Sequence, residues 1–263
     1  MTASVMALGV VLAVGMLLWL VSIVLRNSSI IDIAWGPLFF VIALVEYAAR
    51  RGDLERCVLA LVLVGVWAGR LALHLLIRNG VTHEDRRYAA MRARHGTQWA
   101  LVSLPLVFLL QPVLAWIVAL PLQAVMLARE EPRIGWVDGA AALLVVAGTL
   151  VEATADIQLA RFRSSGRRGG VLDSGLWRYS RHPNYFGDFL TWWGFGALGV
   201  AAGSPWTLAG PVLMTLLLLR VSGVTLLEET IGARRPEYAD YQRRTNAFFP
   251  GPPKTPHVEA RHG

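Results

Sequence analysis

Long apolar runs follow one another along most of this chain of 263 residues and limit what it can fold into. The first run, from Ser4 to Leu25, contains no charged residue, and similar runs recur as far as residue 227. About 20 apolar residues are needed to cross the hydrocarbon of a bilayer as a helix. Only 16% of the residues are charged, whereas soluble domains carry about 25%. The sequence therefore predicts an all-α, polytopic membrane bundle.

We predict about seven membrane-spanning helices in a single transmembrane domain, residues 1–250. Their approximate bounds are 4–25, 30–48, 55–77, 99–128, 135–155, 185–203 and 205–227. Three prolines in the fourth span, Pro105, Pro112 and Pro121, predict kinks there, because proline removes a helical hydrogen bond. Residues 251–263 are Pro-rich and polar, which predicts a disordered tail.

The cations are distributed unevenly between the predicted loops. With the N-terminus outside, the inner loops and the C-terminal tail hold 18 Arg and Lys residues, and the outer loops hold five. Cytoplasmic loops carry the excess of Arg and Lys, so this distribution predicts an outer N-terminus and a cytoplasmic C-terminus. The net charge of +7 lies in short loops and does not indicate a nucleic-acid partner. The single Cys57 excludes an intramolecular disulfide and a cysteine metal cluster, and no metal site is predicted.

The segment from Gly175 to Asp188 is dense in polar and aromatic side chains and runs directly into an apolar segment. It contains two Arg, one His, one Asn, one Asp, two Tyr and one Trp. A membrane anchor explains the Arg and aromatic residues. It does not explain the run from His182 to Asp188, because polar groups near hydrocarbon are costly without a partner. This segment therefore predicts a ligand site in a cavity that opens to the cytoplasm.

Glu152 and Asp156 lie four residues apart, so a helix places both carboxylates on one face. Arg161 and Arg163 follow, and the planar guanidinium group suits phosphate. This set fits the ribose and phosphate groups of a nucleotide, although acids that pair with nearby arginines at a helix end explain it as well. The chain has neither a strand-flanked GxGxxG fingerprint nor a P-loop, so a nucleotide would bind within the helical bundle.

Further polar groups lie at the predicted helix ends. Asp32 falls in the second span, where an acid is expected to face the bundle interior. Tyr88 follows the third span, and a Tyr hydroxyl can donate a hydrogen bond to a substrate carbonyl. The alternatives are an interhelical hydrogen bond for Asp32 and a solvated, salt-bridged loop around Tyr88. Glu228 and Glu229 end the last span. They either bind a ligand or form salt bridges with the Arg-rich loop 161–181.

Four motifs together resemble the steroid 5α-reductase-like superfamily, and in particular its bacterial branch. They are Gly175 to Asp188, Asp32-x-x-Trp35-Gly36, Glu84-Asp85-Arg86-x-Tyr88 and Tyr241-x-Arg243-Arg244-Thr245-x-x-Phe248-x-Pro250. The resemblance extends from about residue 28 to 250, and the reductase-like signature covers 152–250. It implies an NADPH-dependent reductase in the bacterial inner membrane. Hydride would pass to the β carbon of an enone in a steroid-like or other lipid substrate.

The same resemblance implies roles for individual residues. The implied and predicted cofactor-binding residues are Asp156, Arg163, Tyr179, Arg181, His182, Asn184, Asp188 and Tyr241. Asp188 stands where the better-known steroid reductases have Glu. Tyr88 matches the catalytic Tyr that polarises the ketone. The catalytic Glu of the family has no counterpart here, so Asp32 is predicted in its place and Glu84 as the next acid.

Two other functions fit parts of the sequence. Arg181-His182-Pro183-x-Tyr185-x-Gly187, together with Glu228-Glu229, also resembles the isoprenylcysteine carboxyl methyltransferases, which bind S-adenosylmethionine in a helical cavity. A non-catalytic lipid-binding membrane protein is the second alternative. The run Asn184 to Asp188 and the predicted seven spans favour the reductase.

Overall fold

The computed structural model of the protein describes residues 2–50, 54–81, 83–128, 134–166, 170–221 and 237–254. Regular structure within these ranges is helical, which confirms the predicted all-α class. The chain divides into two compact units. The first contains residues 1–143 and 193–213, and the second contains residues 144–192 and 214–263.

Five helical stretches of the described chain are long and apolar enough to cross a membrane, which confirms a multi-pass membrane protein. They are Thr2–Leu25, Ile30–Ala48, Leu54–Asn79, Arg86–Val118 and Trp136–Ser164. The predicted count of seven is too high for these residues. Helix α9 (Pro183–Ala201) has 19 residues, but its polar first turns and four glycines lower its hydropathy. The last predicted span is a shorter apolar helix, Pro205–Arg220, and 222–227 lie outside the described residues.

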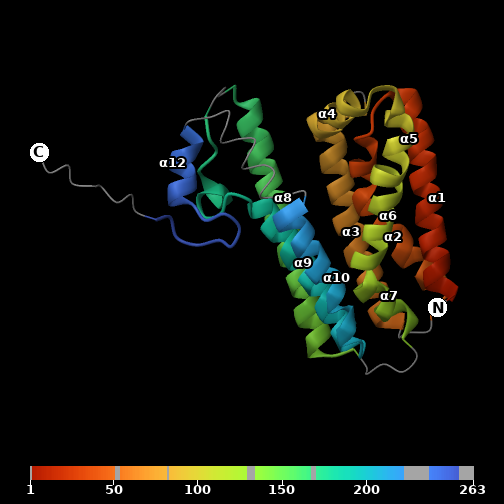
Figure 1. Ribbon diagram of the computed structural model, residues 1–263. Helices are drawn as coiled ribbons and strands as arrows, with labels where there is room; N and C mark the ends of the chain where they lie inside the picture. The colour runs from red at the N-terminus through yellow and green to blue at the C-terminus, as the bar shows by residue number, and fades with distance from the viewer. Residues whose placement is uncertain are drawn as a thin grey trace, which may run out of the picture. The chain divides into compact units, whose positions relative to one another are not determined.

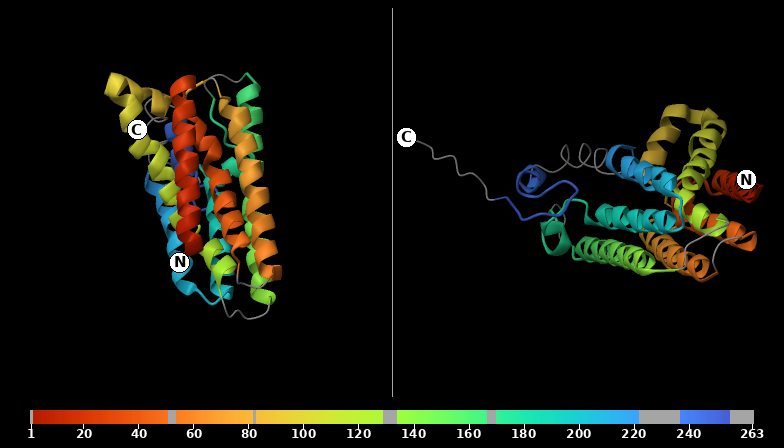
Figure 2. Two further views of the ribbon diagram at one scale, coloured as in Figure 1. Left: turned by 90° about the vertical axis from the view of Figure 1, so that its right-hand side faces the viewer. Right: turned by 90° about the horizontal axis from the view of Figure 1, so that it is seen from below.

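The first unit is built around three consecutive helices, α1 (Thr2–Leu25), α2 (Ile30–Ala48) and α3 (Leu54–Asn79). Helix α2 packs against both of the others and lies between them (Figure 1, Figure 2). A methyl group at Gly36 of α2 would lie 3.0 Å from the carbonyl oxygen of Ala68. Gly36 therefore lets the backbones of α2 and α3 approach closely, a packing role for this part of the Asp32-x-x-Trp35-Gly36 motif.

The fourth apolar stretch is broken into short segments, and the middle part of this stretch packs against α1 (Figure 1). They are α4 (Arg86–His95), η1 (Gly96–Gln98), α5 (Trp99–Ser103), the π-helical η2 (Leu104–Leu109), α6 (Leu110–Val118) and α7 (Leu120–Leu127). Pro105 lies in η2 and Pro121 in the first turn of α7, so both coincide with predicted irregularities. Proline removes one helical hydrogen bond, and a π turn accommodates the loss. Helix α6 continues through Pro112.

A buried ion pair connects α3 to the first turn of α8 (Trp136–Ser164). The Arg56 guanidinium donates to both carboxylate oxygens of Asp138 at 2.7 and 3.1 Å, and each side chain is at most 3% exposed. The amide of Gly135 donates to the same carboxylate. Arg56 is one of the five cations assigned to the outer loops from the sequence, but its charge is neutralised inside the unit. A bidentate pair of this kind offsets the cost of burying both charges.

In the second unit, the later part of α8 crosses the first part of α9 at two glycines. A methyl group at Gly148 would lie 2.5 Å from the Thr191 amide nitrogen, and one at Gly187 would lie 2.5 Å from the Glu152 amide nitrogen. Any larger residue at either position would push the helices apart. The glycine of the Asn184-Tyr185-Phe186-Gly187-Asp188 run therefore has a packing function.

Helix α12 (Glu237–Arg244) lies beside the loop that joins α8 to α9 (Figure 1). The Tyr241 hydroxyl donates to the Trp177 carbonyl at 2.5 Å, and the Ser180 hydroxyl donates to the Phe248 carbonyl at 2.8 Å. In the predicted disordered tail, the Gly251 amide donates to the Tyr179 carbonyl. Residues 255–263 of that tail lie outside the described residues.

Candidate functional site

The loop before α4 places Tyr88 in the first turn of that helix. Asp85 caps α4, since its side chain accepts a hydrogen bond from the Arg87 amide at 2.9 Å. The Asp85 amide in turn donates to the Ser29 hydroxyl at 2.6 Å, which ties the loop to the start of α2. Capping fixes the direction of the first helical turn, so the Tyr88 side chain enters the unit and is only 6% exposed.

Tyr88 meets Asp32 at the N-terminal end of α2. The Tyr88 hydroxyl donates to one Asp32 carboxylate oxygen at 2.6 Å, and Arg87 donates to the other at 2.9 Å. The Gln111 side-chain amide, from α6, donates to the Tyr88 oxygen at 3.1 Å. Three helices thus contribute to one network, which we call the Tyr88 network (Tyr88, Asp32, Arg87 and Gln111). The structure brings together the two residues predicted to face the substrate carbonyl.

In the Tyr88 network, the hydrogen bond that the Tyr88 hydroxyl donates can pass from Asp32 to another acceptor. The Tyr88 proton points at Asp32, while Gln111 occupies an acceptor position on the same oxygen. Arg87 supplies a positive charge to Asp32 and lies 5.5 Å from the centre of the Tyr88 ring. A carbonyl oxygen that approached Tyr88 would compete with Asp32 for its hydrogen bond. The arrangement suits a group that strengthens a hydrogen bond as negative charge develops on a substrate.

Glu84, the next predicted acid, lies in a different set of contacts. Its carboxylate accepts from the Ser28 amide at 2.7 Å and from Arg92 at 2.8 and 2.9 Å. Burial opposes its ionisation, but Arg92 and the Ser28 amide outweigh burial and lower the pKa of Glu84. An ionised carboxylate only accepts hydrogen bonds. Glu84 therefore acts as a charged anchor for the loop, and these hydrogen bonds join it to Ser28 and Arg92 instead of Tyr88.

In the second unit, the predicted nucleotide residues of α8 and α9 meet. The Asn184 amide donates to the Asp156 carboxylate at 3.3 Å. His182 is buried, its ring stacks on Tyr185 with centroids 5.6 Å apart, and its amide donates to the Ser180 hydroxyl. Asp188 and Glu152 are also buried on these two helices.

Three other predicted cofactor residues lie in or near the loop. Tyr179 is 46% exposed, whereas the Tyr241 hydroxyl bonds to a backbone carbonyl in the interior, and burial raises its pKa. Arg181 donates to the Gln242 carbonyl at 2.8 Å, and its amide donates to the Asn246 carbonyl at 2.9 Å. Tyr241 and Arg181 therefore fix the path of the loop relative to α12.

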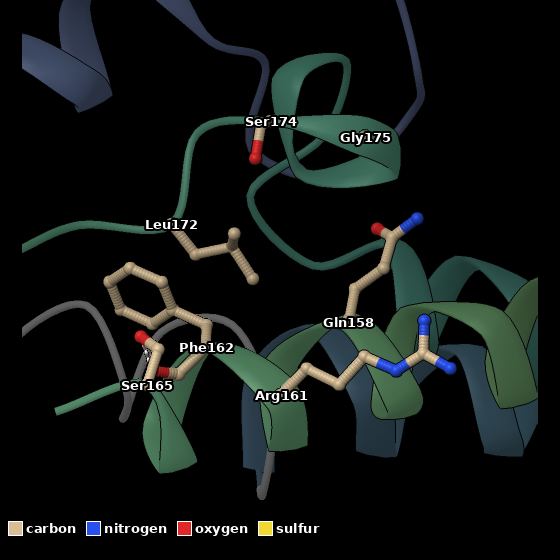
Figure 3. Close-up of a pocket in the computed structure, with 7 residues that line it drawn as sticks. All are labelled: Gln158, Arg161, Phe162, Ser165, Leu172, Ser174 and Gly175. Atoms are coloured by element: carbon tan, nitrogen blue, oxygen red, sulfur yellow. Dashed lines mark hydrogen bonds between the residues drawn. The ribbon is translucent and has the colours of Figure 1, made fainter. Parts of the chain in front are cut away.

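A cavity of about 360 Å³ opens between the end of α8 and the start of the loop (Figure 3). Its lining comprises Gln158, Arg161, Phe162, Ser165, Leu172, Ser174 and Gly175. Phe162 and Leu172 face each other, and the Arg161 side chain extends along α8 away from them. Gln158 accepts from the Leu176 amide at 3.0 Å, which closes one wall. Arg163 is exposed on the last turn of the same helix but does not line the cavity.

The sequence interpretation missed two members of the Tyr88 network. Gln111 is a polar residue inside an apolar run, a signal that could have identified it. Arg87 fell at the unassigned position of the motif Glu84-Asp85-Arg86-x-Tyr88, among four other charged or polar side chains. Arg167 and Arg168, which follow α8, and Glu228 with Glu229 lie outside the described residues.

Comparison with known proteins gives a family. No solved structure matches the chain. A Schizosaccharomyces pombe protein, described as uncharacterized protein C594.04c, is 27% identical over 268 residues, which cover 90% of this chain and 76% of that protein. A family described as "Protein of unknown function (DUF1295)" matches residues 18–245, which include the Tyr88 network, Asp156 and Asn184. The chain therefore belongs to the DUF1295 family of proteins and is a multi-pass membrane protein.

Proposed function

We propose that this protein is a membrane-embedded, NADPH-dependent reductase that acts on the C=C bond of an enone in a steroid-like or other lipid. The observation that carries the proposal is the Tyr88 network, in which a nearly buried phenol meets a carboxylate at 2.6 Å and a side-chain amide at 3.1 Å. The resemblance of four motifs to the steroid 5α-reductase-like superfamily supports the same activity.

In this reaction the β carbon of the enone receives a hydride, and the electron pair of the C=C bond moves toward the carbonyl oxygen. Tyr88 donates a hydrogen bond to that oxygen and binds the developing enolate more tightly than the ketone. A proton from water then adds at the α carbon as the electron pair returns from the enolate oxygen, which completes the saturated ketone. Asp32, Gln111 and Arg87 are positioning residues, because they act through the Tyr88 hydroxyl and its ring.

NADPH, when bound, would supply the hydride, and the second unit offers the groups to hold it. Asp156 and Asn184 form an acceptor and donor pair suited to ribose hydroxyls. Arg161 and Arg163 are exposed cations at the end of α8, and Arg161 lines the cavity of Figure 3. Guanidinium groups bind phosphate through two parallel hydrogen bonds.

We also propose that the N-terminus lies outside the bacterial inner membrane and the C-terminus in the cytoplasm, where NADPH is available. The excess of Arg and Lys in the predicted inner loops supports this orientation. Single cysteines in a Cys57→Ser background, at Ala49 and at Lys254, test it with a membrane-impermeant reagent on sealed cells. Labelling of position 49 alone is expected, and labelling of position 254 would reverse the proposal.

A methyltransferase and a non-catalytic lipid-binding protein are the two alternatives to the reductase, and one experiment distinguishes the three functions. Arg181-His182-Pro183 with Tyr185 and Gly187 also fits a methyltransferase that binds S-adenosylmethionine. A ligand that binds only the folded state stabilises it, by about 2.7 kcal/mol at one hundred times its Kd. Thermal unfolding of the purified protein should shift upward with NADPH. A shift with S-adenosylmethionine alone would favour the methyltransferase, and no shift with either would favour a lipid-binding protein.

A further inference from the structure

A polar groove in the first unit, separate from the Tyr88 network, lies where α1 ends and α5 begins. Its volume is about 300 Å³. The polar residues that line it are Ser22, Arg26, Ser28, Arg92, Thr97 and Ser103. Two cations and four hydroxyl groups thus surround one space at the end of a membrane-spanning helix. The Ser22 and Ser103 hydroxyls donate to backbone carbonyls of their own helices. Donors for the oxygen atoms of an anion therefore come from Arg26, Arg92, Ser28 and Thr97.

The charges of this groove sum to one positive charge. Arg26 and Arg92 are both cations, but Arg92 donates two hydrogen bonds to the Glu84 carboxylate, at 2.8 and 2.9 Å. Arg92 is also held in place by Trp99, whose ring centre lies 5.9 Å from the guanidinium carbon. Trp99 in turn donates to the Ser28 hydroxyl at 3.1 Å. A net charge of +1 matches a phosphodiester, which carries one negative charge, better than a doubly charged phosphate.

The backbone at Arg26 adds a second observation. Helix α1 ends with the Asn27 amide donating to the Ser22 carbonyl at 3.1 Å, and Arg26 between them has φ of 50°. Glycine usually occupies this left-handed position after a helix, because a side chain there is unfavourable. Arg26 is the one non-glycine residue with positive φ among the described residues. Strain of this kind concentrates at ligand sites, and here it directs a guanidinium to the groove.

Apolar side chains adjoin the same groove. Ile23 lines it and is 43% exposed, while Val24 of α1 and Leu101 of α5 are 83% and 74% exposed. Such residues on membrane-spanning helices face acyl chains. A molecule in which a singly charged phosphate adjoins long hydrocarbon chains fits both the charged groove and these apolar side chains. We propose that this groove binds the phosphodiester headgroup of a membrane phospholipid, with its acyl chains along α1 and α5.

Native mass spectrometry of the full-length protein tests this proposal. The delipidated protein in detergent is titrated with phosphatidylglycerol, with diacylglycerol of the same chains, and with inorganic phosphate. We expect phosphatidylglycerol to bind, and Arg26→Ala and Thr97→Glu to weaken its binding about five- to tenfold, because one removes a cation and the other adds a like charge. Binding of diacylglycerol or of inorganic phosphate as strong as that of phosphatidylglycerol would overturn the proposal.

Two matched variants test whether lipid binding depends on this groove or on surface charge in general. Arg94→Ala removes the same charge from an exposed position of α4, and Gln98→Glu adds the same charge next to Thr97, but neither residue lines the groove. Both should keep wild-type lipid binding. Equal losses in the matched variants, or wild-type binding in Arg26→Ala and Thr97→Glu, would reject the site. Thermal unfolding of each variant shows whether it is folded.

Discussion

In the first unit, the polar side chains of the Tyr88 network bond to one another, whereas those of the second-unit loop bond mostly to backbone carbonyls. Tyr88, Asp32 and Gln111 exchange side-chain hydrogen bonds across three helices. Tyr241 and Ser180 instead hold carbonyl groups of the loop and of the segment after α12. Side chains that share a proton can redistribute it during a reaction, and side chains bonded to backbone fix the path of a chain. The two tyrosines should therefore respond differently to the same substitution.

The largest effect is expected for Tyr88→Phe. Removing one hydrogen-bond donor to a developing oxyanion typically costs about 10²- to 10³-fold in turnover. Reduction of an enone lipid by the variant should fall by that factor, while its NADPH affinity stays unchanged. Tyr47→Phe, on the same bundle but outside the network, is the matched control. Wild-type turnover in Tyr88→Phe would remove Tyr88 from the mechanism.

The second-largest expected effects are losses of NADPH affinity, and they test whether the second unit holds the nucleotide site. Loss of a charge-assisted hydrogen bond costs about 1.5–3 kcal/mol, which is about 10- to 150-fold in affinity. We expect Arg163→Ala to weaken NADPH binding in this range, as measured by fluorescence titration. Asn184→Ala removes a neutral hydrogen bond, which contributes about 0.5–1.5 kcal/mol, and should weaken binding about 2- to 12-fold. Arg243→Ala is the matched control, because Arg243 is 73% exposed on α12 and pairs with Asp240. If both test variants bind NADPH like the wild type, the nucleotide site lies elsewhere.

Tyr241→Phe should lower the stability of the folded protein. The Trp177 carbonyl would lose its buried donor, and an unsatisfied buried group costs about 1–3 kcal/mol. Thermal unfolding should therefore begin at a lower temperature, while turnover at a temperature where the variant is folded stays near wild type. Tyr179→Phe, at an exposed position, should leave the unfolding temperature unchanged. A turnover loss without a stability loss would give Tyr241 a direct role at the cofactor.

The residues differ in how far the sequence alone could predict them. The resemblance to the reductases implies Tyr88, and Asp32 is predicted in place of the family Glu because it lies inside a span. The structure places the Tyr88 hydroxyl 2.6 Å from the Asp32 carboxylate. Glu84 was grouped with them by proximity in sequence, but its partner Arg92 lies eight residues later, within α4. The span count was too high because apolar length alone does not register the four glycines of α9.

The crossing of α8 and α9 allows a sharper test of packing in the second unit. Gly187→Ala would place a methyl group 2.5 Å from the Glu152 amide nitrogen, and overpacking of this kind costs about 1–3 kcal/mol. Gly139→Ala, in the first turns of α8 and outside this crossing, meets no atom within 4 Å and should stabilise the helix slightly. Thermal unfolding of the two variants should therefore shift in opposite directions. A stable Gly187→Ala variant would mean that the two helices can separate without loss.

The smallest expected effect concerns the Glu84–Arg92 pair, and its pH dependence separates it from the Tyr88 network. The pKa of Glu84 is lowered from an ordinary value of 4.5, so its contribution is fully present above that pH and is lost as pH falls through the folded-state pKa. A partly exposed ion pair contributes roughly 0.2–1 kcal/mol. Glu84→Gln should therefore be slightly less stable than the wild type at pH 7, and this difference in stability should shrink as the pH falls below 4.5. Because Glu84 anchors the loop and does not bond to Tyr88, turnover at pH 7 should change far less than in Tyr88→Phe. A turnover loss as large as that of Tyr88→Phe would instead give Glu84 a role in the reaction itself, together with the Tyr88 network.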